Sequence, residues 1–211
     1  MIIDCISDLH GYKPLLEGGD LLIIAGDLTA RDTKSEYADF LKWLDPISFK
    51  YKKIILIAGN HDGLIKKYGT ELLPGFCTYL QDSGCDFQGL KIWGSPWTKS
   101  FSGMNPHCKA FTCDTDEDLE KKWELFPDDI DILITHSPPY GYFDYVIRNH
   151  NCGSVSLRNH VMNRIKPKLH VFGHIHEWGG RILDTNITKF VNASHVNEYY
   201  EPVNEPVRII L

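Results

Sequence analysis

Five short motifs rich in histidine and aspartate recur along this chain, and each carries side chains that can bind a metal ion. They are Asp8-Leu9-His10, Gly26-Asp27, Gly59-Asn60-His61-Asp62, His136 and Gly173-His174-Ile175-His176. Carboxylate and amide oxygens together with imidazole nitrogens suit Mn(II), Fe or Zn(II), whereas a thiolate-rich set would indicate other chemistry. The motifs supply enough ligands for two divalent ions side by side, and two-metal sites chiefly hydrolyse phosphate esters and related bonds.

Several of these residues also have structural explanations, as a loop cap (Asp8), as turn residues (Asp27, Asn60) or as a surface pair (His61-Asp62). His174 and His176 are harder to explain in this way, because two histidines two residues apart beside a glycine favour chelation. The occurrence of all five motifs in one chain favours a shared metal site over five unrelated turns.

The motifs follow apolar runs of the kind that form buried strands. Runs of four to six aliphatic and β-branched residues are typical of strands that are buried on both faces. Such runs occupy residues 1–6, 21–25, 53–58, 130–134 and 169–172. Open α/β sheets place their ligands at the carboxyl ends of the strands. We therefore expect five strands to deliver their last residues to one edge.

Helices are predicted between these strands. Thr33-Lys34-Ser35-Glu36 is a capping box, and apolar residues then recur at helical spacing until Pro46. Residues 154–165 predict a second helix, and residues 116–123 predict a shorter third one. Late in the chain, strands joined by turns predict a second sheet with antiparallel pairing, over residues 181–183, 187–191 and 207–211.

Composition limits the class of protein. The chain has 211 residues and 43% hydrophobic content, which suits one domain, residues 1–211, with a sizeable core. A net charge of -6 argues against DNA or an anionic membrane as a partner. None of the six cysteines forms a Cys-x-x-Cys pair, which argues against a zinc finger or a thioredoxin-like motif. Because no apolar run reaches membrane-spanning length, we expect a soluble, cytoplasmic protein.

The five motifs resemble the signature of the calcineurin-like metallophosphoesterases, which runs D-x-H, G-D, G-N-H-[DE], H and G-H-x-H in this order. Within that family, the chain is similar to the metallophosphoesterase-domain-containing (MPPED) group at residues 91–97, 135–141, 166–179 and 191–194. The resemblance implies an α/β fold, a four-layer αββα sandwich of two mixed β-sheets. It also implies a dinuclear metal site at the carboxyl ends of the strands.

The resemblance also implies a ligand set. The first metal ion is expected on Asp8, His10 and His176, and the second on Asn60, His136 and His174. Asp27 is expected to bridge both ions, with one carboxylate oxygen on each. Mn(II) is the favoured ion, with Fe or Zn(II) as alternatives. The nucleophile would be a metal-bound hydroxide, because coordination lowers the pKa of water from about 15.7 towards about 7.

His61 is expected to act without binding metal, by protonating the leaving oxygen or stabilising charge on phosphorus, with Asp62 orienting its ring. Among the other histidines, His170 lies in an apolar strand pattern and is expected in the core, whereas His160 is expected in solvent. Three further side chains could border the site: His107, Asp144 and Arg148.

These features predict a metal-dependent phosphodiesterase or phosphomonoesterase that acts on a small, nucleotide-like ester. One alternative is a nucleotide-binding regulatory protein that retains the fold with little turnover, although intact His61 and His174 argue against it. Another is a nuclease, against which the acidic charge weighs.

Overall fold

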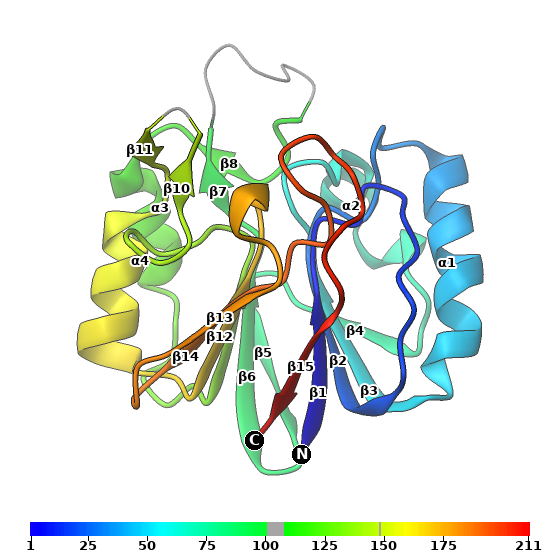
Figure 1. Cartoon of the computed structure of the whole chain (residues 1–211), viewed down its shortest axis with the longest axis horizontal. Coiled ribbons are helices and arrows are strands. Elements are labelled where there is room, and N and C mark those ends of the chain that lie inside the picture. Colours follow the sequence, from blue (N-terminus) through cyan, green and yellow to red (C-terminus); the bar gives the residue numbers. More distant parts are fainter. Residues whose placement is uncertain (101–107, 148) are drawn as a thin grey trace.

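Two β-sheets pack face to face, and helices cover their outer faces (Figure 1). The computed structural model describes residues 1–100, 108–147 and 149–211. His107 and Arg148, which the sequence places near the site, lie outside these described residues. The layers follow the order helix, sheet, sheet, helix, so the predicted four-layer αββα sandwich is confirmed.

The first sheet carries the motifs from the amino-terminal part of the chain. Its four parallel strands are β1 (Ile2–Ile6), β2 (Gly19–Ala25), β3 (Tyr51–Ile57) and β4 (Cys77–Tyr79). The chain end returns as β15 (Val207–Ile210), which pairs antiparallel with β1. This position corrects the prediction that residues 207–211 join the second sheet. The hydrophobic pattern that identifies a strand carries no information about which distant strand it pairs with.

The second sheet carries the remaining motifs and is also mixed. Its order is β13 (Arg181–Asp184), β14 (Lys189–Asn192), β12 (Leu169–Phe172), β9 (Ile132–Thr135), β6 (Leu90–Ser95) and β5 (Ser83–Phe87). The four central strands run parallel, while β13 and β5 pair antiparallel at the two edges. The predicted antiparallel pairing of the late strands is therefore confirmed for β13 and β14.

The continuous apolar runs reflect burial of both faces of the central strands. In β2, Leu21 and Ile23 face the opposite sheet, whereas Leu22 and Ile24 pack beneath the helical layer. Strand geometry alternates side chains between the two faces, so each strand contributes to two core layers. Strands whose last four residues are buried therefore lead into each of the motifs.

Helices pack around the sheets. Helix α1 (Lys34–Ser48) covers the first sheet and begins at the predicted capping box, with Thr33 as N-cap. It continues for two residues past Pro46, because a proline in the last turn removes little of the hydrogen-bond ladder. The others are α2 (Gly63–Tyr68) with a 3₁₀ turn at Gly69–Leu72, α3 (Asp116–Trp123), and α4 (Val155–Asn159), which continues as a π-helix over His160–Ile165.

Two short strand pairs and one 3₁₀ turn lie near the carboxyl ends of the strands. They are β7 (Thr98–Lys99) with β8 (Thr112–Cys113), β10 (Tyr145–Val146) with β11 (His150–Asn151), and the turn His176–Trp178. No helix among the described residues is long and apolar enough to cross a membrane.

Candidate metal centre

The metal-ligand candidates stand on sharp turns directly after the strands. β1 leads into Asp8 and His10, β2 leads into Asp27, and β12 leads into His174. All four have a positive φ, between 43° and 71°. Non-glycine residues rarely adopt this conformation, and the strain of order 1–3 kcal/mol per residue concentrates at functional sites. The backbone conformation at these strand ends therefore costs local stability and directs the four side chains towards one another.

The first group of converging side chains joins the two sheets. His176 Nε2 lies 3.2 Å from Asp8 Oδ1 and 3.3 Å from His10 Nε2. Asp8 is fully buried and His10 almost so. Two imidazole nitrogens and one carboxylate oxygen thus face a common point, as one divalent ion requires.

A second group surrounds Asp27. Its Oδ2 lies 3.4 Å from His136 Nε2, 3.9 Å from His10 Nε2 and 4.0 Å from His61 Nε2. Asn60 Oδ1 lies 3.1 Å from His136 Nε2, so the amide presents its oxygen to the same space. The ring of His174 is 4.9 Å from that of His136, measured between centroids. The structure therefore brings together all seven side chains expected to bind metal.

The two carboxylates also bind the surrounding backbone. Asp8 Oδ2 accepts hydrogen bonds from the His174 amide at 2.9 Å and the Ser194 hydroxyl at 2.7 Å, which leaves Oδ1 for the histidines. Asp27 Oδ1 accepts from the His61 amide at 2.8 Å. Asp27 Oδ2 therefore faces the ring nitrogens of His136, His10 and His61. The bridge expected of Asp27, with one carboxylate oxygen on each ion, stays a prediction.

Close packing against two glycines fixes these carboxylates. A Cβ at Gly59 would lie 2.3 Å from Asp27 Oδ1, and a Cβ at Gly173 would lie 2.1 Å from Asp8 Oδ2. Any side chain at either position would displace the carboxylate from the histidines. The glycines in the Gly-Asn-His and Gly-His-x-His motifs are thus needed for this close approach.

The sequence predicts that Asp62 contacts the ring of His61. In the structure the Asp62 carboxylate has other partners. It accepts hydrogen bonds from the amides of Asp27, Leu28 and Gly59 at 2.8–3.1 Å, and from the Tyr37 hydroxyl at 3.2 Å. Asp62 therefore ties the loop after β2 to the loop after β3. It acts on the backbone that carries Asp27 and His61, because its carboxylate is already engaged there.

The Nδ1 side of the His61 ring contacts a cysteine. His61 Nδ1 lies 3.3 Å from Cys108 Sγ, which leaves Nε2 directed at Asp27. Cys108 belongs to the segment before β8, and its backbone carbonyl accepts a hydrogen bond from the Asn60 amide at 3.4 Å. Sequence reasoning missed this residue because it stands in no motif and follows no strand.

Burial and the charges of the cluster determine its protonation. Burial lowers the pKa of His10 to about 4 and that of His174 to about 3, which keeps both rings neutral and able to bind metal. Burial also opposes charge on His136, but the Asp27 carboxylate outweighs it and raises the His136 pKa to about 9. The same attraction lowers the pKa of Asp27 against the effect of burial. An ionised carboxylate surrounded by imidazoles is the donor set that a divalent cation needs.

The remaining candidates serve the fold. His170 is completely buried and its Nε2 lies 2.8 Å from the Thr135 hydroxyl, so its predicted core position is confirmed. His160 is only partly exposed, and Arg164 donates a hydrogen bond to its ring. Asp144 is buried and accepts hydrogen bonds from Asn151 and Gly153, so it holds the β10–β11 hairpin instead of meeting a substrate.

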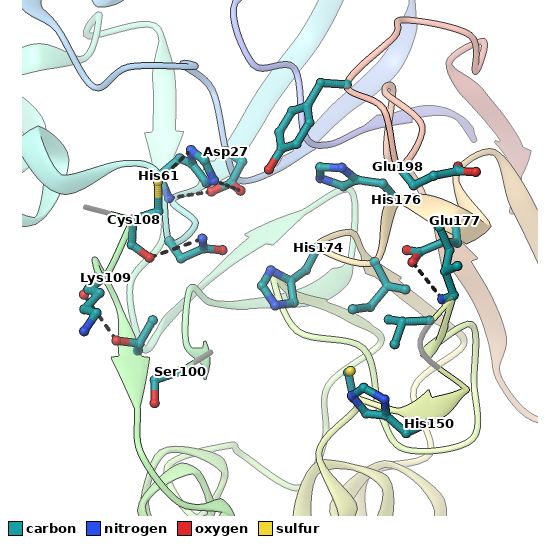
Figure 2. Close-up of a pocket in the computed structure, with 17 residues that line it drawn as sticks. Asp27, His61, Ser100, Cys108, Lys109, His150, His174, His176, Glu177 and Glu198 are labelled. Carbon is teal, nitrogen blue, oxygen red and sulfur yellow. Dashed lines mark hydrogen bonds and ion pairs between the residues drawn. The ribbon is translucent and has the colours of Figure 1, made fainter. Parts of the chain in front are cut away.

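A cavity of about 300 Å³ opens beside the cluster (Figure 2). Asp27, His61, His174 and His176 line it together with Cys108, Lys109, Val146, Ile147, Ile175, Glu177, Glu198 and Tyr200 among others. In Figure 2, Cys108 and Lys109 lie on the side of His61, whereas Glu177 and Glu198 lie on the side of His176. The buried ionisable cluster therefore has direct access to a space for a small molecule.

Comparison with known proteins agrees with this geometry. A family model described as calcineurin-like phosphoesterase matches residues 1–178. Metallophosphoesterase domain-containing protein 1 of Homo sapiens is 38% identical to this chain, covering 98% of it and 70% of the human protein. A UPF0046 protein of Caenorhabditis elegans is 34% identical, covering 96% of this chain and 78% of its own length.

Solved structures share the fold at much lower identity. One chain aligns with a TM-score of 0.66 at 14% identity, covering 90% of this chain and 89% of its own length. A putative 5'-nucleotidase from Staphylococcus aureus aligns with a TM-score of 0.52 at 10% identity, covering 99% of this chain and 53% of that chain. At such identities the likeness concerns the fold alone.

Proposed function

This chain belongs to the calcineurin-like phosphoesterase family, and from that membership we propose that it hydrolyses small, nucleotide-like phosphate esters at a dinuclear centre. Membership supports a metal-dependent phosphoesterase in general terms. The proposal adds the two ions, with Mn(II) favoured, and the class of ester. The proposal includes both phosphodiesters and phosphomonoesters.

One observation carries the proposal: buried carboxylates and imidazoles from both sheets converge beside a cavity. Asp8 and Asp27 are almost inaccessible to solvent, and their outward oxygens lie 3.2–4.0 Å from histidine nitrogens. Two divalent cations between the sheets would neutralise this pair of buried carboxylates, and a protein interior favours such pairing of charge.

Each side chain has a distinct task in this proposal. Asp8, His10 and His176 would hold one ion, Asn60, His136 and His174 would hold the other, and Asp27 would bind both. Bound ions would supply an activated water nucleophile and neutralise charge on the phosphoryl oxygens. His61 lies outside both sets and directs Nε2 towards the same space, so it is placed to donate a proton to the leaving oxygen.

The walls of the cavity support a small ester over a nucleic acid. Val146, Ile147 and Ile175 provide an apolar surface for the organic part of the substrate. Lys109 lines the cavity on the side away from Glu177 and can contact a phosphate oxygen. Glu177 and Glu198 add negative charge that would repel a continuous phosphate backbone. These features favour the esterase over the nuclease.

The proposal is tested by hydrolysis of bis-p-nitrophenyl phosphate, p-nitrophenyl phosphate and 2′,3′-cyclic AMP in the presence of Mn(II). We expect turnover by the native chain and none above background by Asp27→Ala. Asp45→Ala, which removes an exposed carboxylate from α1, is the matched control and should retain full activity.

Bound metal must be quantified in the same samples. Native protein that carries two equivalents of Mn(II) and hydrolyses none of the three esters would contradict the proposal. Tight binding of AMP or GMP without turnover would instead favour the regulatory protein.

A further inference from the structure

Tyr200 lies against two of the histidines expected to bind metal, although it stands beyond the 1–178 region that matches the family model. Its ring centroid is 4.8 Å from that of His10 and 5.1 Å from that of His176. Both contacts are edge-to-face, with interplanar angles of 72° and 90°. Aromatic rings in contact prefer such edge-to-face arrangements.

A compact hydrogen-bonded turn delivers this ring to the site. The Asn197 side-chain oxygen accepts hydrogen bonds from the amides of Tyr199 and Glu201, both at 2.9 Å. The Tyr200 amide donates to the Asn197 carbonyl at 2.9 Å, and the Asn197 amide donates to the Glu201 carbonyl at 2.9 Å. The position of Tyr200 is therefore determined by the turn and does not depend on its side chain alone.

The backbone of Tyr200 is strained. Its φ is +62°, in the left-handed region that bulky side chains rarely adopt. Glycine or asparagine would satisfy this turn with less strain. A tyrosine in this conformation therefore points to a role for its ring at the site.

His10 shows what that role is. Metal-binding histidines usually have their second ring nitrogen held by a hydrogen bond, which fixes the ring. His136 follows this rule, because its Nδ1 lies 2.9 Å from the Ala25 carbonyl oxygen. The buried Nδ1 of His10 has no hydrogen-bond partner within the described part of the chain. Its ring is instead packed edge-to-face between His61, at 4.6 Å between centroids, and Tyr200.

We propose that Tyr200 is a positioning residue that holds the His10 and His176 rings with their Nε2 atoms converging, and so sets the affinity for one of the two ions. This inference rests on the proposed dinuclear function. It assigns part of the metal site to a turn that lies outside the five motifs. Packing of the Tyr200 ring takes the place of a hydrogen bond to His10 Nδ1, which no described residue makes.

The test compares Tyr200→Phe, Tyr200→Ala and Tyr200→Gly, with Tyr199→Ala as the matched control. Tyr199 belongs to the same turn but is 71% exposed and lies outside the cavity lining. Mn(II) binding by calorimetry gives the affinity of each equivalent, and the visible spectrum of the Co(II) form reports the ligand geometry. Thermal unfolding without metal measures the strain.

We expect Tyr200→Phe and Tyr199→Ala to match the native chain in both readouts. Tyr200→Ala and Tyr200→Gly should lose about tenfold in affinity for one equivalent, leave the other unchanged and alter the Co(II) spectrum. Metal-free Tyr200→Gly should unfold at the native temperature or above it, since glycine relieves the positive φ. Weaker metal binding in a more stable protein would separate positioning from general support of the fold.

Native affinity and spectrum in Tyr200→Gly would overturn the inference, and so would weaker binding in Tyr200→Phe, which keeps the ring. Neither result affects the proposed function, which fails independently if the native chain binds two ions without turnover. Native protein that binds no divalent ion would overturn both.

Discussion

Asp27 shows how much one residue contributes to the site. Its amide donates to Asp62, its Oδ1 accepts from the His61 amide, and its Oδ2 faces three imidazoles. The backbone amide and both carboxylate oxygens of Asp27 therefore contact residues that follow other strands. The motif Gly26-Asp27 is too short to predict such a role, and only its occurrence with four other motifs indicates it.

The role of His61 can be separated from metal binding through the leaving group. Removing the proton donor should cost most when the departing oxygen is basic, because a good leaving group needs little protonation. We expect His61→Ala to lower kcat by about 10²–10⁴-fold on 2′,3′-cyclic AMP, and by a smaller factor on bis-p-nitrophenyl phosphate. Equal losses of kcat on the two substrates, measured at equal metal occupancy, would contradict proton donation. They would indicate that His61 stabilises charge on phosphorus or supports the structure of the site.

Several residues of the site were predictable from the sequence and others were not. The seven ligand candidates follow apolar strands and carry metal-binding chemistry, so their type and position in the chain identify them. Cys108 and Tyr200 contact His61 and His10 from segments that contain no motif. The Asp62 carboxylate turned out to bind backbone amides. Such contacts depend on how loops pack, which local patterns do not encode.

At the scale of elements, α1 is coupled to the site through its capping box. Glu36 accepts hydrogen bonds from the amides of Ala30, Arg31 and Thr33, so it orders the loop that follows Asp27. Helix and loop are therefore stabilised by one carboxylate at the helix start.

Glu36→Ala would leave these amides without their acceptor, and we expect it to reduce the free energy of unfolding by about 1–3 kcal/mol. Urea unfolding measures this loss. Asp39→Ala removes an exposed carboxylate from the same helix and should change stability by less than about 0.5 kcal/mol. A Glu36 effect no larger than that of Asp39 would show that the loop is ordered by other contacts.

Strand β12 contains a buried histidine whose protonation should weaken the fold. The Thr135 hydroxyl donates to the Ser137 carbonyl, so it accepts from His170 Nε2, and burial lowers the His170 pKa to about 3. The folded pKa lies below the unfolded value of about 6.5. His170 therefore contributes stability above that value, and the contribution is lost as the pH falls towards 3.

Between pH 7 and pH 5 this linkage should cost about 2 kcal/mol of unfolding free energy. His170→Gln keeps a donor for Thr135 without a titrating ring, so its stability should fall less over the same interval. Urea unfolding at the two pH values gives the difference. Identical losses in the native chain and the variant would exclude His170 as the source.

At the scale of the whole molecule, the candidate metal ligands come from both sheets. Asp8, His10, Asp27 and Asn60 follow strands of the first sheet, whereas His136, His174 and His176 follow strands of the second. The individual strands were predictable from apolar runs. The assignment of β15 to the first sheet was not, because its pairing with β1 joins the two ends of the chain.

Metal should accordingly stabilise the packing of the sheets. An ion at a hundred times its Kd adds about 2.7 kcal/mol to the folded state, which corresponds to roughly 5–10 °C in Tm for a chain of this size. Scanning calorimetry with Mn(II) and with EDTA should show this shift in the native chain and in His61→Ala. Asp27→Asn should lose most of it, and an undiminished shift in that variant would place the ions elsewhere.

The central claim is that two ions lie between the sheets with Asp27 between them. Anomalous scattering from crystals loaded with Mn(II) tests this directly. We expect two peaks about 3.5–4 Å apart, one beside Asp8, His10 and His176 and the other beside Asn60, His136 and His174. A single peak at full metal occupancy, or peaks away from Asp27, would contradict the account.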